Sequence, residues 1–249
     1  MSVRNLDKLF NPESVALIGA SPRPGSVGAG IARNLRRAGF AGEMMLVNPK
    51  HITIDGLIVH PNITSLPRTP DLAVIATPAE TVPSLIGELV ERGTRAAVII
   101  TAGFAELGER GHSLQQAILD AAKPRLMRII GPNCVGIMVP WVGLDATFSH
   151  VAAPTGDIAF ISQSGAIVTA MLDWAVPRSI GFSHVVSLGD GLRGQPAPPA
   201  APSRNDNFLG CRRSARSGDA DLYERASGAA ALPDRCCRMA QHVKRELSF

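Results

Sequence analysis

Aromatic side chains make up only 4% of the 249-residue sequence, and its four cysteines lack metal-ligand spacing. A core built from this chain therefore consists mostly of Val, Ile, Leu and Ala. The cysteines fit reduced, unpaired thiols. No apolar run is long enough to cross a bilayer, and the first residues lack the apolar stretch of a signal peptide. We therefore expect a cytoplasmic protein with no membrane partner.

The basic net charge is confined to the end of the chain. Residues 1–190 hold 15 basic and 15 acidic side chains, whereas residues 191–249 hold 10 basic and 6 acidic ones and so account for the formal charge of +4. The part of the chain expected to fold is thus balanced in charge. It has no excess of basic side chains of the kind that binds nucleic acid.

One stretch near the N-terminus organises the rest of the chain. Residues 15–18 are apolar and predict a strand covered on both faces, and a helix is expected from about Val27. The loop between them contains small residues that let backbone N–H groups approach an anion at a helix start, namely Gly19, Ala20, Ser21, Gly25 and Ser26. This pattern favours phosphate or nucleotide binding over glycines that only make the turn.

Strands and helices then alternate along the chain. The pattern predicts a Rossmann-like, doubly wound parallel sheet with right-handed crossovers. Polar, Gly- and Pro-containing segments follow the strand ends, where open α/β sheets bind ligands. They should converge on one crevice with the first loop. The expected strands are 15–18, 44–47, 72–76, 96–100 and 128–130, and the expected helices are 27–38, 80–92 and 111–122. A turn or hairpin is expected over 52–59. The polar segments that follow strand ends are 48–50, 77–78, 101–106 and 131–134.

The pattern restarts after a predicted connection at 135–156. A strand at 157–161, a helix at 166–175 and a strand at 184–188 predict the opening βαβ unit of a second α/β domain. We expect a first domain over 1–140, a linker over 141–156, the start of the second domain over 157–190, and a tail over 191–249.

The tail differs in composition from the rest. Residues 191–249 contain no Ile and one Val, against ten Ala and nine Arg. Without β-branched residues for further central strands, this segment cannot complete the second domain. We expect it to be mostly irregular or weakly helical.

The two common nucleotide fingerprints are absent. The loop Gly19-x5-Gly25-x2-Gly28 is not G-x-G-x-x-G, and no Walker sequence follows it. The second strand ends in Asn48-Pro49-Lys50, with a cation where a dinucleotide-binding domain carries an acid. Lys50 favours a ligand with an extra phosphate, such as NADP or coenzyme A (CoA). An ordinary surface lysine is the alternative.

Five motifs, in order and at matching spacing, resemble one family over residues 6–190. The sequence is similar to the CoA-binding part of NDP-forming acyl-CoA synthetases, the ADP-forming acetate–CoA ligases, and more distantly to the succinyl-CoA synthetase alpha subunit. Similar modules form the front of some bacterial protein acetyltransferases. The motifs are LFNPESVALIGAS (9–21), VNPK (47–50), TAGFAE (101–106), GPNCVG (131–136) and ISQSGA (161–166).

The resemblance implies a CoA- or acyl-CoA-binding first domain followed by the start of a flavodoxin-like, succinyl-CoA-ligase-like domain. The 21–27 loop would hold the pyrophosphate, and Lys50 would pair with a CoA phosphate. A helix start in the second domain would face a phosphorylated histidine. The implied cofactor-binding residues are Gly19, Ser21, Arg23, Pro24, Gly25, Ser26, Val27, Asn48, Lys50, Thr77, Pro78, Thr101, Ala102, Gly103, Phe104 and Asn133, and the phosphate-facing residues are Ser162, Gln163, Ser164 and Gly165.

The sequence also departs from the family. No segment resembles that of the phosphohistidine, and the likeness stops at Asp190, as in a truncated or frame-shifted reading frame. We therefore expect no catalytic residue and no metal ligand. The chain alone should be unable to convert acyl-CoA, NDP and phosphate to acid, CoA and NTP. NDP and Mg would bind only through an ATP-grasp partner. A CoA-sensing regulatory module and an NADP-dependent oxidoreductase remain alternatives.

Overall fold

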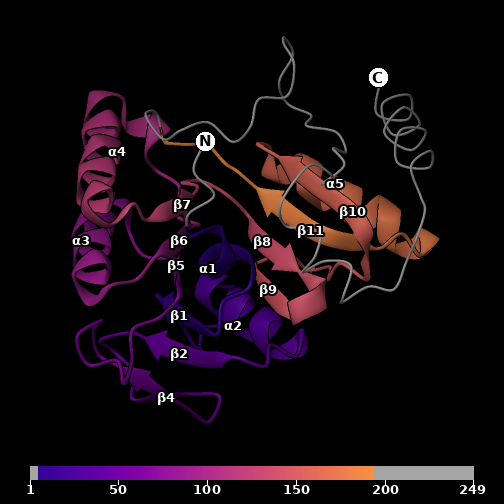
Figure 1. Cartoon of the computed structure of the whole chain (residues 1–249), viewed down its shortest axis with the longest axis horizontal. Coiled ribbons are helices and arrows are strands. Elements are labelled where there is room, and N and C mark those ends of the chain that lie inside the picture. The colour runs from indigo at the N-terminus through magenta and orange to yellow at the C-terminus, as the bar shows by residue number, and fades with distance from the viewer. Residues whose placement is uncertain (1–4, 193–249) are drawn as a thin grey trace.

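The computed structural model describes residues 5–192, so the expectations for the tail lie outside the described residues, apart from 191 and 192. The larger of two sheets has the order β3-β4-β2-β1-β5-β6-β7 (Figure 1). Six of its strands are parallel, in the order of a dinucleotide-binding fold, and β3 adds an antiparallel edge. The strands are β1 (Ser14–Ile18), β2 (Glu43–Val47), β3 (Thr53–Ile54), β4 (Leu57–His60), β5 (Leu72–Ile75), β6 (Ala96–Ile99) and β7 (Arg128–Ile130).

Helices cover both faces of this sheet, as a doubly wound fold requires. The short α1 (Leu6–Phe10) and α2 (Val27–Arg37) pack on one face, and α3 (Val82–Arg92) and α4 (Glu109–Ala122) pack on the other. The predicted fold class is confirmed. Single 3-10 turns precede α3 and α4 and follow α4, at Ala79–Thr81, Ala105–Leu107 and Lys123–Arg125.

The alternation of side chains along each strand supplies both cores. Leu17, Val74 and Val98 face α2, whereas Ile18 and Ile75 face α3 and α4. All five are at most 3% exposed. Because both faces are covered, the strands are apolar throughout, which is why they could be predicted from their sequence.

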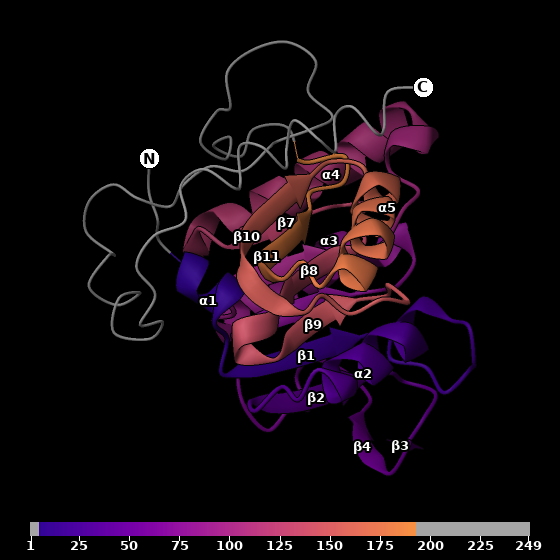
Figure 2. The same cartoon turned by 90° about the vertical axis from the view of Figure 1, so that its right-hand side faces the viewer.

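A second, four-stranded sheet packs on the α2 face of the first. Its order is β10-β11-β8-β9, and Figure 2 shows α5 on its outer side. β10 and β11 are parallel and joined through α5, as expected for the βαβ unit, whereas β8 is antiparallel to β11. The elements are β8 (Gly136–Val139), β9 (Leu144–Thr147), β10 (Thr155–Ser162), α5 (Gly165–Ala175) and β11 (Phe182–Ser187), with 3-10 turns at Pro140–Val142 and Val176–Arg178.

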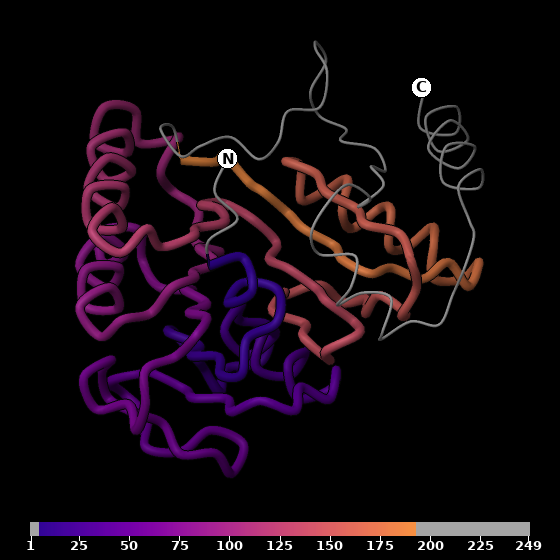
Figure 3. The backbone as a smooth tube through the Cα atoms, in the orientation of Figure 1, coloured from indigo at the N-terminus to yellow at the C-terminus, as the bar shows by residue number. Residues whose placement is uncertain are grey.

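The prediction of a connection over 135–156 was wrong. This segment contains the β8–β9 hairpin, turned at Pro140–Val142. Pro140 and Gly143 are typical of loops, but the short strands beside them are buried. β8 pairs with β11, more than forty residues later, so its partner is invisible in the local pattern. The chain leaves the larger sheet at β7 and enters the smaller one through β8 (Figure 3).

None of the helices within residues 5–192 is both long and apolar enough to span a membrane.

Candidate functional site

The loop after β1 is shaped by two glycines that allow close backbone approach. Gly19 has φ 96°, and a Cβ there would lie 2.4 Å from the carbonyl oxygen of Ala76 after β5. A Cβ on Gly28 would lie 2.1 Å from the Gly19 oxygen. These contacts bring the start of α2 against the end of β1, beside β5. This is the point where the strand order reverses, and open α/β sheets bind ligands there.

Ser26 begins α2. Its Oγ accepts a hydrogen bond from the Ala29 amide at 3.3 Å and donates one to the Arg23 oxygen at 2.8 Å. The remaining free N–H groups of the first turn and the helix dipole favour an anion at this end. Residues 22–25 of the loop are exposed to solvent.

Hydrogen bonds join the neighbouring strand ends. The Thr101 hydroxyl after β6 donates to the Thr77 oxygen after β5 at 2.7 Å, and the Asn133 amide donates to the Thr101 oxygen at 2.9 Å. The Asn48 Nδ2 group after β2 donates to the Ala20 oxygen at 2.7 Å. The segments after β1, β2, β5, β6 and β7 therefore form a linked edge.

The second domain reaches the same edge through two contacts. The Asn133 Nδ2 group donates to Asp190 Oδ1 at 3.2 Å, and the Asp190 amide donates to the Pro132 oxygen at 3.0 Å. The start of α5 is capped by Ser164, whose Oγ accepts from the Ile167 amide at 3.4 Å. A second helix N-terminus thus opens at this edge.

A cleft of about 750 Å³ lies between these elements. It brings together residues from both sheets, and Asp190 is the single charged side chain among those that line it. The lining consists of Val27, Ala76, Thr77, Ile100, Thr101, Ala102, Asn133, Cys134, Val135, Phe148, Gln163, Ser164, Gly165, Ala166, Thr169 and Asp190.

Eight of the residues proposed from sequence line this cleft: Val27, Thr77, Thr101, Ala102, Asn133, Gln163, Ser164 and Gly165. Others lie near it in the chain without lining it. The side chain of Phe104 is fully buried in the core against α3 and α4, so it is not available to a ligand. The remaining residues outside the lining are Gly19, Ser21, Arg23, Pro24, Gly25, Ser26, Asn48, Lys50, Pro78, Gly103 and Ser162.

Several lining residues were not proposed from sequence. Ala76 and Ile100 stand at predicted strand ends, so their position in the chain could have indicated them. Phe148 follows β9, which was predicted as part of a connection. Nothing in the sequence pattern indicated that Phe148 would reach a ligand site. Asp190 was noted only as the point where the family likeness stops. Cys134 lies in the segment 131–134 that was expected at the crevice but was not proposed as a site residue, and the other residues missed are Val135, Ala166 and Thr169.

The titratable groups near the cleft do not form a nucleophilic site. Burial raises the pKa of the Cys134 thiol to about 12, and its Sγ donates to the Ile99 oxygen at 3.2 Å. A thiol in this state is not a nucleophile at neutral pH. Within residues 5–192, no group of three or more His, Cys, Asp or Glu side chains could hold a metal ion.

Comparison with protein families matches both parts of the chain. Residues 13–140 match a model described as a CoA binding domain, and residues 155–195 match one described as a succinyl-CoA ligase like flavodoxin domain. The likeness thus runs to residue 195 rather than stopping at Asp190.

Two curated relatives show the same relationship. The chain is 42% identical over 185 residues to acetate–CoA ligase [ADP-forming] I of Archaeoglobus fulgidus, a match that covers 74% of this chain and 27% of the relative. It is 40% identical over 190 residues to acetate–CoA ligase [ADP-forming] I subunit alpha of Pyrococcus furiosus, covering 75% of this chain and 41% of that subunit. The chain therefore spans less than half the length of these relatives.

Solved structures agree with the sequences. A Pyrococcus horikoshii OT3 protein superposes with a TM-score of 0.71 at 40% identity, over 74% of this chain and 42% of that one. The dinucleotide forming acetyl-coenzyme A synthetase 1 of Ca. Korarchaeum cryptofilum, in complex with phosphate and ADP, superposes with a TM-score of 0.70 at 38% identity, over 74% of this chain and 39% of that one. The chain belongs to the NDP-forming acyl-CoA synthetase family, with which it shares the CoA-binding domain.

Proposed function

We propose that the cleft binds CoA or acyl-CoA and that the chain serves as the CoA-binding part of an acyl-CoA ligase that forms NTP from NDP. One observation carries this proposal. The cleft is lined both by Thr77 and Thr101 of the region that matches a CoA binding domain and by Ser164 and Gly165 of the succinyl-CoA ligase like region. Residues of both matched regions thus line one cleft.

The residues at the cleft suit the parts of CoA. The capped start of α2 and the 21–27 loop, exposed at residues 22–25, offer backbone N–H groups for the pyrophosphate. Lys50 is exposed after β2, on the same edge of the sheet, where it can pair with a further phosphate. A cleft of about 750 Å³ lies within the usual range of small-molecule sites. CoA would extend from it onto the exposed loop.

The start of α5 is proposed to face the phosphoryl group of the ligase reaction. Ser162 Oγ accepts from the Ser164 amide at 3.1 Å, which holds the turn that precedes the capped helix. Gln163 and Ser164 line the cleft there. A second anion-attracting helix start is what a site for CoA and a separate phosphate requires.

NDP and Mg are proposed to bind to an ATP-grasp subunit or domain. Mg prefers several oxygen ligands, and Asp190 is the single carboxylate among the residues that line the cleft. The Pyrococcus furiosus relative is named as an alpha subunit, and the Korarchaeum relative was solved with phosphate and ADP. The first name implies a further subunit, and the second shows that a relative binds phosphate and ADP.

The 249-residue chain is proposed not to run the ligase reaction alone. None of its six histidines stands in a segment like that of the family's phosphohistidine. His184, in β11, is half-buried and packs edge-on against Phe10 with ring centroids 5.2 Å apart. Burial lowers its pKa. These contacts are those of a packing residue.

Titration calorimetry of the 249-residue chain with CoA, acetyl-CoA and NADP tests the proposal. We expect CoA and acetyl-CoA to bind and NADP to bind much more weakly. Tight NADP binding without CoA binding would overturn the proposal and favour an oxidoreductase.

A further inference from the structure

Two apolar side chains in the cleft face solvent. Val27 and Phe148 are each 40% exposed, and both line the cleft. Covering such surface with a ligand is favourable, and an aromatic ring offers a large contact area. The other markedly exposed large apolar side chains among residues 5–192 do not line this cleft; they are Ile52, Ile58, Leu107, Leu126 and Trp141.

Phe148 is held in place by α2. The fully buried Asn34 donates from its Nδ2 group to the oxygens of Thr147 and Ser149, both at 2.8 Å. These two carbonyl groups flank Phe148. A Cβ on Gly30 of α2 would lie 3.4 Å from the Phe148 Cβ, so the helix backbone at Gly30 packs against this residue. The backbone that carries the ring is therefore held by α2, and the side chain forms part of the cleft wall.

The place of this wall indicates which part of the ligand it contacts. Val27 ends the 21–27 loop proposed to hold the pyrophosphate and begins α2, whereas Phe148 directly follows β9 of the second sheet, in which α5 joins β10 and β11. The proposed phosphoryl site at Ser164 lines the same cleft. The end of CoA that reacts must lie toward that site. The group that differs among acyl-CoA molecules is attached at this end.

We infer that Phe148 is a specificity-determining residue that contacts the acyl group and limits its size. This inference rests on the proposed function. Shortening the side chain at position 148 should open space for a longer acyl chain while leaving CoA itself little affected. In apolar pockets, one methylene group changes discrimination by about 10- to 200-fold.

The experiment compares the binding of CoA, acetyl-CoA and hexanoyl-CoA to the 249-residue chain and to Phe148→Ala by calorimetry. We expect the affinity for hexanoyl-CoA relative to acetyl-CoA to rise about tenfold or more, with CoA affinity within about threefold of the unaltered chain. Trp141→Ala is the matched control, because Trp141 is a 52% exposed aromatic residue that does not line the cleft. In Trp141→Ala, the affinity for hexanoyl-CoA relative to acetyl-CoA should not change.

Thermal unfolding of each variant shows whether it is folded, and Phe148→Leu supplies the measurement if the alanine variant is not. An unchanged ratio in a folded variant would overturn the inference. An equal loss of affinity for all three ligands would also overturn it, since Phe148 would then contact the part that they share. If the unaltered chain bound none of them, the proposed function itself would fail, and the inference with it.

Discussion

Asp145 carries a charge that the fold disfavours. The carboxyl group lies in β9 with its side chain 5% exposed, and burial raises its pKa from 3.8 to about 6. The Thr147 hydroxyl, which donates to Asp145 Oδ1 at 2.7 Å, and Arg37, 3.9 Å from Oδ2, oppose the rise without cancelling it. Oδ2 has no hydrogen-bond partner among the described residues.

The first prediction follows from this charge. Because the folded chain binds the proton more tightly than the unfolded one, the contribution of Asp145 to stability is present below pH 3.8 and is lost as the pH rises through about 6. Asp145→Asn should therefore increase the free energy of unfolding at pH 7 by about 1–3 kcal/mol and change it little at pH 4. Urea unfolding across this pH range measures the difference. Asp157→Asn, at an exposed position, is the control, and a difference that does not vary with pH would refute the prediction.

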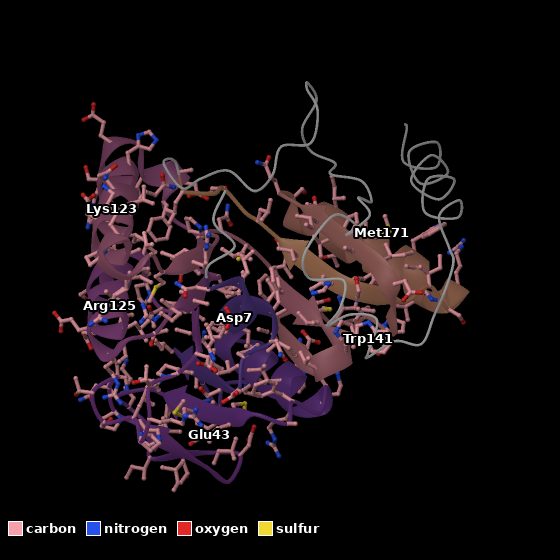
Figure 4. All side chains as sticks on the ribbon, viewed as in Figure 1. Asp7, Glu43, Lys123, Arg125, Trp141 and Met171 are labelled. Atoms are coloured by element: carbon pink, nitrogen blue, oxygen red, sulfur yellow. The ribbon has the colours of Figure 1, made fainter. Side chains whose placement is uncertain are left out.

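Lys50 gives a second prediction at the level of one side chain. Its amide donates to Asn48 Oδ1 at 2.8 Å, which shapes the turn after β2, and its ammonium group is exposed. Lys50→Glu should weaken CoA binding by about 1–3 kcal/mol, since a charge-assisted phosphate contact is lost. Calorimetry measures this change. Lys123→Glu alters the charge equally just after α4, at an exposed residue that does not line the cleft (Figure 4), and should leave binding unaffected. If both variants changed the CoA affinity equally, Lys50 would be an ordinary surface lysine without a phosphate contact.

Among the elements, α2 has two roles. Its N-terminus opens at the cleft, and its side chain Asn34 donates to the oxygens of Thr147, the last residue of edge strand β9, and of Ser149 just beyond it. The helix thereby closes a sheet edge and joins the two sheets.

A third prediction tests this connection. Asn34→Ala leaves two buried carbonyl groups without a donor and should lower the free energy of unfolding by about 2–4 kcal/mol. Urea unfolding provides the value. Gln116→Ala, on the exposed side of α4, should change stability by less than about 0.5 kcal/mol. A similarly small effect at Asn34 would mean that β9 is held by other contacts.

The elements also show what the sequence could predict. The strands of the larger sheet are covered on both faces, so their apolar runs stand out, and Ser26 and Gly93 mark a helix start and a helix end. β8 and β9 were missed because Pro140 and Gly143 beside them are typical of loops and because their partners β11 and Asn34 are far away in the chain. The same limit applies to the cleft. Residues directly after predicted strands could be placed from the chain, whereas Phe148 follows the missed strand β9.

At the scale of the whole molecule, the fourth prediction concerns activity. The 249-residue chain, mixed with acyl-CoA, ADP, phosphate and Mg, should form no ATP above background, because no phosphohistidine segment is present. A coupled assay for ATP measures this. Adding an ATP-grasp subunit of a relative should not restore turnover, whereas CoA binding should persist. ATP formation by the chain alone would contradict the prediction, and binding without turnover would also suit a CoA-sensing module.

The most direct test of the central claim is amide hydrogen exchange of the 249-residue chain, measured by mass spectrometry with and without CoA. If one cleft joins the two matched regions around CoA, exchange should slow in two segments far apart in the sequence, residues 20–30 and residues 163–169. The second crevice, lined by Arg95 and Arg125 among others, should be unaffected. Protection confined to that crevice, or no protection in either segment at saturating CoA, would contradict the account.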